Sequence, residues 1–153
     1  MLVTRVCQKL SDKKVKYAIV GGYAVALHGA VRGTMDLDLV IENNLKSYVL
    51  AEKALKELGF DSRLPVDGET VFHFREEYIK NRNLVAWSFY NPGDPSEIVD
   101  IVITHDLSKS KRKKISLDTM KIYVLSKPDL IAMKKESGRP QDLADAQALE
   151  MLS

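Results

Sequence analysis

The chain has 153 residues, of which 45% are hydrophobic and 29% are charged. This length suits one ordinary domain, so we expect a single domain over residues 1–153. The composition excludes a membrane-embedded protein, since no apolar run approaches the ~20 residues that span a bilayer. The N-terminus mixes charged and apolar residues, unlike a signal peptide, and Cys7 has no second thiol for a disulfide or a zinc site. We therefore expect a cytoplasmic protein.

The net charge of +2 hides an uneven distribution of lysine and arginine. The segment 105–135 carries nine Lys and Arg against three Asp, a local +6, so the remainder is near −4. Its densest part, the run 109–114, is either a solvated basic loop or a patch that binds the phosphates of RNA. The run has no interleaved aromatic residues, so it gives no indication of sequence-specific RNA recognition.

Apolar periodicity and glycine positions predict alternating helices and strands in the first part of the chain. Leu2, Val6 and Leu10 recur at four-residue spacing, which predicts an amphipathic helix that ends before Lys13. Glycines then separate or close the elements that follow. These elements are a strand at 15–20, a glycine turn at 21–22, a helix at 23–28, a strand at 37–41 and a helix at 45–58.

The middle of the chain is rich in β-branched and aromatic residues, which predicts a cluster of strands. Strands are expected at 70–75, 84–90 and 97–103, and a further one at 120–125. The stretch 91–95 contains two prolines and a glycine and is expected to form the turn between the second and third of these strands.

Two helices are predicted at the C-terminus, each with a proline in its first turn. Pro128 opens the first, Gly138 stops it, and Pro140 opens the second. On the second, an apolar stripe is expected from Leu143, Ala146 and Leu149. Because helices and strands alternate early and strands cluster later, we predict an α+β fold, with a central mixed β-sheet flanked by helices and a helical C-terminus.

Two aspartates lie two residues apart at the predicted strand 37–41. Alternation along a strand sends Asp36 and Asp38 to one face and Leu37 and Leu39 to the other. Residues two apart on a strand are roughly 6.5 to 7 Å from each other, so two ionised carboxylates disfavour one another unless a cation lies between them. Magnesium takes oxygen ligands and is usually held by one or two carboxylates plus substrate phosphates, so it fits this pair.

Asp100 is the third candidate ligand, because it is an acid inside a β-branched stretch where an unpaired buried charge would be costly. If its strand lies beside that of Asp36 and Asp38, the three acids can hold two cations, an arrangement suited to in-line phosphoryl displacement. We expect two Mg²⁺ ions, with Mn²⁺ as the alternative. Each acid alone also fits a salt bridge or a solvated sheet face, and it is their grouping that favours a metal site.

The glycine pair Gly21 and Gly22 follows a strand and precedes a helix. Its backbone N–H groups, with the positive end of that helix, could bind a phosphate. A glycine pair by itself is more often a tight turn with positive φ. Thirteen residues lie between Gly22 and Asp36, enough for one short helix and a return into the neighbouring strand, and this spacing favours the phosphate role.

These features in this order resemble the nucleotidyltransferases of the DNA polymerase beta superfamily: Gly21-Gly22, then Asp36-Leu37-Asp38-Leu39, then Asp100 in a later strand. The string from Gly21 to Asp36 is similar to the small prokaryotic members, including those of toxin–antitoxin and abortive-infection systems. The resemblance implies a nucleotidyltransferase-like palm. It also implies that the glycines contact a nucleoside triphosphate and that the three acids are metal ligands and catalytic residues.

The resemblance extends to the C-terminal helices, through 127–134 and 138–145. It implies that Lys134 and Arg139 contact the triphosphate or the acceptor, while Asp142 and Asp145 are either helix-start acids or partners that orient those cations. Arg32 could clamp a phosphate with its planar guanidinium, or it could be a surface arginine.

Together these residues predict an enzyme that transfers a nucleoside monophosphate from a nucleoside triphosphate such as ATP to an acceptor hydroxyl. The acceptor could be a tRNA, a protein or a small molecule such as an antibiotic, and no membrane or particular oligomeric state is indicated. The alternative is a non-catalytic module of the same fold, antitoxin-like or regulatory, that binds a protein partner. A simple RNA-binding domain, which relies on the basic run alone, ranks last.

Overall fold

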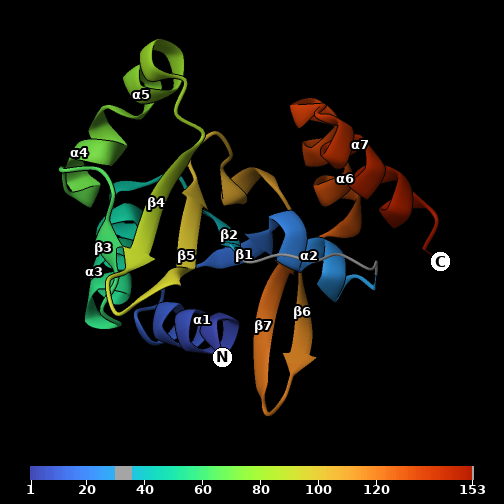
Figure 1. Cartoon of the computed structure of the whole chain (residues 1–153), viewed down its shortest axis with the longest axis horizontal. Helices are drawn as coiled ribbons and strands as arrows, with labels where there is room; N and C mark the ends of the chain where they lie inside the picture. The colour runs from blue at the N-terminus through green and yellow to red at the C-terminus, as the bar shows by residue number, and fades with distance from the viewer. Residues whose placement is uncertain (30–35, 153) are drawn as a thin grey trace.

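The computed structural model describes residues 1–29 and 36–152 (Figure 1). The strands are β1 (Tyr17–Val20), β2 (Asp36–Ile41), β3 (Asp61–Ser62), β4 (Ala86–Asn91), β5 (Asp94–Val102), β6 (Arg112–Leu117) and β7 (Met120–Leu125). The helices are α1 (Leu2–Asp12), α2 (Gly21–Leu27), α3 (Leu45–Glu57), α4 (Gly68–His73), α5 (Arg75–Arg82), α6 (Lys127–Ser137) and α7 (Pro140–Glu150), with a 3₁₀ turn η1 (Leu107–Lys109). Within these described residues the strands form one seven-stranded sheet, in the order β3-β4-β5-β2-β1-β7-β6.

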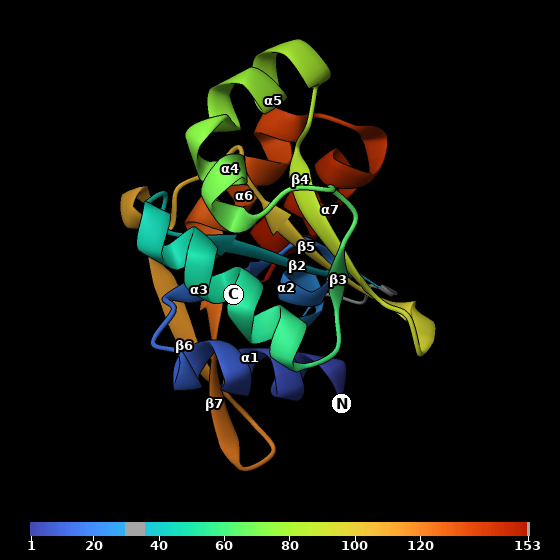
Figure 2. The same cartoon turned by 90° about the vertical axis from the view of Figure 1, so that its left-hand side faces the viewer.

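Helices cover both faces of this sheet. α1 and α3 lie on one face, whereas α2 and the pair α6–α7 lie on the other (Figure 1, Figure 2). Leu37, Leu39, Trp87, Phe89 and Ile101 are fully buried in the sheet's core. In the described part of the chain, no helix has both the length and the apolar character needed to cross a membrane. The predicted α+β fold, with a mixed sheet flanked by helices and a helical C-terminus, is confirmed.

The pairing of β2 with β5 determines where the predicted acids lie. These strands run parallel, and their register places Asp38 opposite Asp100. On the other side of β2, the antiparallel strand β1 places Val20 opposite Asp38. The helix α2 starts next to this carboxylate, at Gly21, so the separate glycine turn predicted at 21–22 is wrong. The expectation that the two acid-bearing strands are neighbours is therefore confirmed.

Local capping signals explain the two C-terminal helices. The hydroxyl of Ser126 accepts a hydrogen bond from the backbone N–H of Asp129, and Gly138 ends α6 with a left-handed φ of 67°. A proline lies in the first turn of each helix, as predicted. The predicted apolar stripe of α7 is wrong at Leu143, which is 50% exposed, while Ala146 and Leu149 are buried.

The predicted strand at 70–75 is wrong, because this segment forms α4 and the start of α5. Its alternating aromatic residues resemble a strand pattern, but Asp67 sets a helix start. The Asp67 carboxylate accepts a hydrogen bond from the backbone N–H of Thr70 at 2.9 Å. This N-cap gives a hydrogen-bond acceptor to a backbone N–H in the first turn of the helix, which has no partner within the helix itself. Val71 of α4 is buried.

The interpretation of the basic run 109–114 as a loop is wrong for residues 112–114. Its second half opens β6, an edge strand that pairs antiparallel with β7. Arg112 lies 3.6 Å above the ring of Tyr123 and donates a hydrogen bond to the backbone oxygen of Tyr17 at 3.0 Å. Lysines on a sheet edge discourage pairing with the edge of another chain, which gives this run a structural reason.

The predicted turn at 91–95 is shorter than expected, since β5 already begins at Asp94.

Candidate active site

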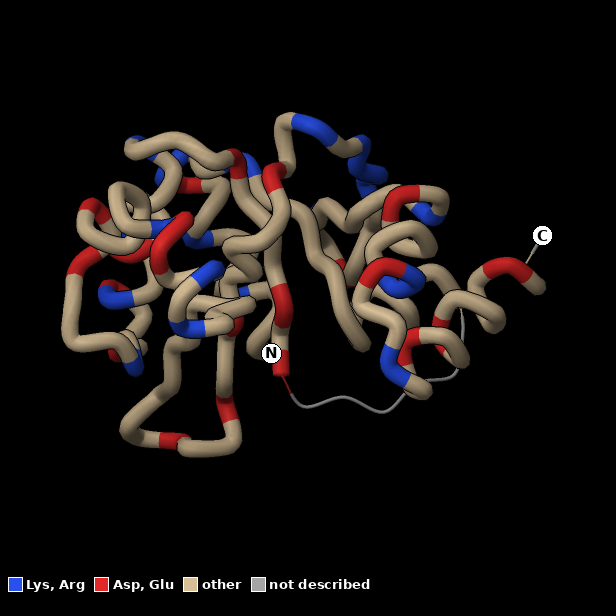
Figure 3. Tube along the Cα trace, turned by 90° about the horizontal axis from the view of Figure 1, so that it is seen from above, with Lys and Arg blue, Asp and Glu red and all other residues tan. Residues whose placement is uncertain are grey.

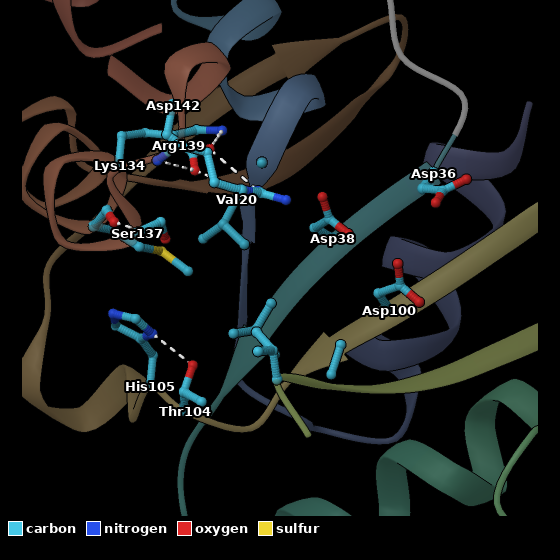
Figure 4. A pocket seen from close by; sticks show the side chains of 15 residues that line it. Val20, Asp36, Asp38, Asp100, Thr104, His105, Lys134, Ser137, Arg139 and Asp142 are labelled. Atoms are coloured by element: carbon cyan, nitrogen blue, oxygen red, sulfur yellow. Dashed lines mark hydrogen bonds and ion pairs between the residues drawn. The ribbon is translucent and has the colours of Figure 1, made fainter. Parts of the chain in front are cut away.

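Carboxylates gather on the parallel strands β2 and β5. Asp38 and Asp100 are paired in register, and Asp36 lies two residues earlier on β2 (Figure 4). The Oδ1 atom of Asp100 is buried and finds no hydrogen-bond partner among the described residues. A buried carboxylate oxygen without a donor is unfavourable, so a ligand or ion at this position would stabilise it.

Burial and repulsion by the Asp100 carboxylate disfavour the ionised state of Asp38 and Asp36. The pKa of Asp38 is raised to about 7, by burial first and by the neighbouring Asp100 carboxylate next. The pKa of Asp36 is raised as well, by burial and then by Asp100, while Arg63 opposes this rise. A bound cation would offset both causes, because it favours the ionised carboxylates.

Gly21 approaches Asp38 so closely that the position has no room for a side chain. A Cβ atom built on Gly21 would lie 2.0 Å from Oδ2 of Asp38, and its φ of +67° is in the left-handed region. Glycine is therefore required by both backbone conformation and packing. Gly22, the next residue, is buried in the first turn of α2.

A network of paired charges joins α6 to α7: Lys134 on α6, Arg139 at the N-cap of α7, and Asp142 and Asp145 on α7. The Lys134 Nζ lies 3.0 Å from Oδ2 of Asp145 and 3.4 Å from Oδ1 of Asp142. Arg139 donates to both oxygens of Asp142, from Nε at 2.7 Å and from Nη2 at 3.2 Å. These hydrogen bonds lower the pKa of the Asp142 carboxyl. The prediction that Asp142 or Asp145 pairs with Lys134 or Arg139 is confirmed.

One pocket of about 330 Å³ separates the acids from this network (Figure 4). The three acids of β2 and β5 line it, and so do Gly21 and the network residues Lys134, Arg139 and Asp142. The remaining wall is formed by Val20, Val85, Ala86, Val102, Thr104, His105, Met133 and Ser137. The sequence analysis missed these last residues as site residues. Apart from the position of Thr104 and His105 directly after the acid-bearing strand, no spacing or motif distinguished them from ordinary sheet and helix residues.

The predicted site residues mostly converge on this pocket. Those that line it are Asp36, Asp38, Asp100, Gly21, Lys134 and Arg139. Gly22 is buried beside it on α2, and Arg32 lies outside the described residues. The structure therefore brings these residues together around one pocket, and their roles in binding and catalysis stay predictions.

The acids suit a divalent cation that takes few protein ligands. In the part of the chain that the structure describes, no group of three or more His, Cys, Asp or Glu could hold a metal ion. Mg²⁺, however, is usually bound by one or two carboxylates together with substrate phosphates and water. Asp38 and Asp100 form such a pair, and the buried Oδ1 of Asp100 offers an oxygen without a protein donor in the described residues. The donor set therefore fits Mg²⁺ bound with a nucleotide.

Solved structures with a similar fold are nucleotidyltransferases or resemble them. A lincomycin-bound lincosamide antibiotic adenylyltransferase, LnuA, has a TM-score of 0.64 and 14% identity, over 99% of this chain and 96% of that one. ANT(2")-Ia in complex with adenylyl-2"-tobramycin has a TM-score of 0.61 and 12% identity, over 97% of this chain and 84% of that one. An antigenic nucleotidyltransferase-like protein from Paracoccidioides brasiliensis has a TM-score of 0.60 and 20% identity, over 97% of this chain and 73% of that one. At these identities the likeness establishes the fold, which is the predicted nucleotidyltransferase fold.

Sequence comparison gives the family. No curated protein sequence matches the chain. A family model does match it over residues 2–145, which is nearly its whole length, and that model describes aminoglycoside-2''-adenylyltransferases. This result agrees with the predicted resemblance to nucleotidyltransferases. The chain belongs to the aminoglycoside-2''-adenylyltransferase family.

Proposed function

We propose that this protein is an adenylyltransferase that transfers AMP from ATP to a hydroxyl group of a small molecule. The observation that carries the proposal is one pocket in which the carboxylates of two adjacent strands lie across from Lys134 and Arg139. The family match supports adenylyl transfer. The similar enzymes bind lincomycin or an adenylylated tobramycin, which supports a small-molecule acceptor. Nothing in these matches supports a tRNA or protein acceptor, or a toxin–antitoxin role.

The acids are assigned to cation binding and to the reacting oxygen. Asp38 and Asp100, with Asp36 two residues earlier on β2, would hold two Mg²⁺ ions together with the phosphates of ATP, and Mn²⁺ is the substitute. Bound divalent cations supply positive charge that stabilises the attacking and leaving oxygens of an in-line displacement. Asp100 would accept the proton that the acceptor hydroxyl loses. Asp38 would hold its cation in place, with Gly21 leaving the space that this carboxylate occupies.

The reaction exchanges one phosphorus–oxygen bond for another. The acceptor oxygen bonds to the α-phosphorus of ATP, the bond from that phosphorus to the bridging oxygen of the β-phosphate breaks, and pyrophosphate leaves. Negative charge accumulates on the phosphates during this step. Lys134 and Arg139, on the opposite side of the pocket from the acids, would neutralise that charge.

A transfer assay tests this proposal. The purified protein would be incubated with ATP labelled at the α-phosphate and Mg²⁺, with lincomycin, tobramycin, tRNA or no acceptor. We expect labelled AMP on a small molecule, together with pyrophosphate, and loss of both products in the Asp38→Asn variant. Label on tRNA or on protein alone would contradict the small-molecule acceptor. Absence of any Mg²⁺-dependent nucleotide binding would contradict adenylyl transfer itself.

A further inference from the structure

Lys134 has an unusual environment for a lysine that lines a pocket. Its side chain is 10% exposed, and the carboxylate side chains of Asp142 and Asp145 around it are 2% and 4% exposed. Asp145 is in turn held by Gln141, whose Nε2 donates to Oδ1 at 2.9 Å. One ammonium group therefore lies between two carboxylates that are fixed by α7. An exposed ion pair would avoid the desolvation cost of this arrangement, so the burial of these charges needs another explanation.

A second ion pair between the same helices provides the comparison. Lys135, the next residue on α6, pairs with Glu150 of α7 at 2.7 Å, with side chains 58% and 47% exposed. This pair connects α6 to α7 without removing any charge from water. The Lys134 network adds a desolvation cost, which buried ion pairs seldom recover in stability. Such a cost fits a role at the pocket, because costly features concentrate at functional sites.

The charge distribution of the pocket indicates what that role is. Asp38 and Asp100 line the pocket that Lys134 also lines, and the described residues offer no hydrogen-bond partner to Oδ1 of Asp100. A lysine side chain is long and flexible, and its ammonium would be attracted to such carboxylates. If it bound them, it would occupy the position of a cation and would be withdrawn from the phosphates.

We infer that Asp142 and Asp145 are positioning residues that hold Lys134 on the α6–α7 side of the pocket and keep its ammonium from occupying the cation site at Asp38 and Asp100. This inference rests on the proposed function. It assigns the two acids of α7 no contact with ATP or the acceptor. They act through Lys134, and Asp142 also acts through Arg139, to which it is bound by two side-chain hydrogen bonds.

The test compares Asp145→Asn with the double variant Lys134→Met/Asp145→Asn, in the full chain. The single variant weakens the hold on the ammonium, so Mn²⁺ binding without nucleotide is expected to fall about 10- to 100-fold. The double variant removes the competing ammonium, so Mn²⁺ binding is expected to return to the wild-type value. Its affinity for a nonhydrolysable ATP analogue is expected to stay at least about tenfold lower, since the phosphates have lost a cation.

Glu150→Gln is the matched control, because it breaks the exposed pair between the same helices. It should leave both affinities unchanged. A merely structural role for Asp145 predicts that the double variant binds Mn²⁺ no better than the single variant. That result, or a single variant with wild-type Mn²⁺ affinity, would overturn the inference.

The outcomes separate the inference from the proposed function. A wild-type protein that binds neither Mn²⁺ nor the analogue contradicts both. If Asp145→Asn does not fold, the double variant is compared with the wild type directly, since removing both members of a buried pair is far better tolerated than removing one. Wild-type Mn²⁺ affinity with weakened analogue binding then supports the inference, and unchanged analogue binding overturns it.

Discussion

Carboxylates lie on both sides of the pocket, but they obtain their counter-charges from different sources. On α6 and α7, Asp142 and Asp145 are bound by Lys134 and Arg139 within hydrogen-bonding or ion-pair distance. On β2, burial and then the neighbouring Asp100 carboxylate of β5 raise the pKa of Asp38 and of Asp36. Figure 3 shows acidic and basic residues interspersed over much of the chain, together with a stretch that carries only Lys and Arg. The contrast in counter-charges is one between the two sides of the pocket.

This difference indicates which side is complete without a ligand. In the network of α6 and α7, the acids and bases are paired with one another without a ligand. On β2 and β5, burial and repulsion between carboxylates disfavour the ionised state of Asp36 and Asp38. A bound cation would offset both effects, because it attracts the ionised carboxylates. Sites that bind or catalyse often carry such a local cost, and removing the cost tends to stabilise the protein while impairing its function.

The largest effect is expected from removing an acid of β2 or β5. Asp100→Asn should lower the rate of adenylyl transfer on the order of a thousandfold, because the cation loses a ligand and the acceptor hydroxyl loses the base that accepts its proton. The same change should stabilise the metal-free protein by up to about 1 kcal/mol at pH 8, since a like-charge cross-strand pair is removed. Transfer assays and chemical denaturation measure the two effects. Asp118→Asn, at an exposed turn with left-handed φ, should change neither.

A second large effect is expected at the glycine beside Asp38. Gly21→Ala places a methyl group where Oδ2 of Asp38 lies, so the carboxylate must move. We expect a decrease in transfer on the order of a hundredfold, as for other small displacements at active sites. Gly59→Ala is the matched control, because Gly59 also has positive φ but no atom within 4 Å of the added methyl. Both variants should lose about 1 kcal/mol of stability through backbone strain; equal transfer activity in the two would contradict the packing argument.

A moderate effect is expected from pH. With a pKa of about 7 for Asp38, protons compete with a cation below that pH, so Mn²⁺ affinity should fall about tenfold per pH unit below 7 and level off above it. The stability of the metal-free protein depends on pH in the opposite direction to the Mn²⁺ affinity. The unfolded chain releases this proton near the ordinary value of 3.8 and the folded protein near 7, so the metal-free protein loses stability as pH rises between them. A pH-independent Mn²⁺ affinity from pH 5.5 to 8.5 would show that Asp38 is not a ligand.

The smallest effect is expected at the exposed pair of α6 and α7. Glu150→Gln should change the free energy of unfolding by less than about 0.5 kcal/mol, because both partners remain in water. Denaturant titration measures this change. A loss above about 1 kcal/mol would mean that the exposed pair, and not the buried network, holds the helices together.

The sequence predicted the parts of the site that local rules determine. Alternation placed Asp36 and Asp38 on one face, and the acid inside a β-branched stretch identified Asp100. Gly138 and the two helix-opening prolines located the helices that carry Lys134 and Arg139. These features depend on backbone preference and spacing, which are read within a few residues of each position.

The remainder depended on contacts between distant segments. The segment 70–75 forms helices because the Asp67 cap and the packing of Val71 outweigh an aromatic alternation that favours a strand. The basic residues at 112–114 belong to an edge strand because β7 is available to pair with them. The neutral wall of the pocket, such as Val85 and Met133, is visible only after β4 and α6 are brought together.

Calorimetric titration of a nonhydrolysable ATP analogue tests the central claim most directly, with the wild type and Asp38→Asn each measured in Mg²⁺ and in a chelator. The account predicts binding by the wild type in Mg²⁺, and affinity at least about a hundredfold weaker after chelation or in the variant. Equal affinity with and without Mg²⁺, or a variant that binds like the wild type, would contradict the claim that the acids of β2 and β5 are completed by a cation and a nucleotide.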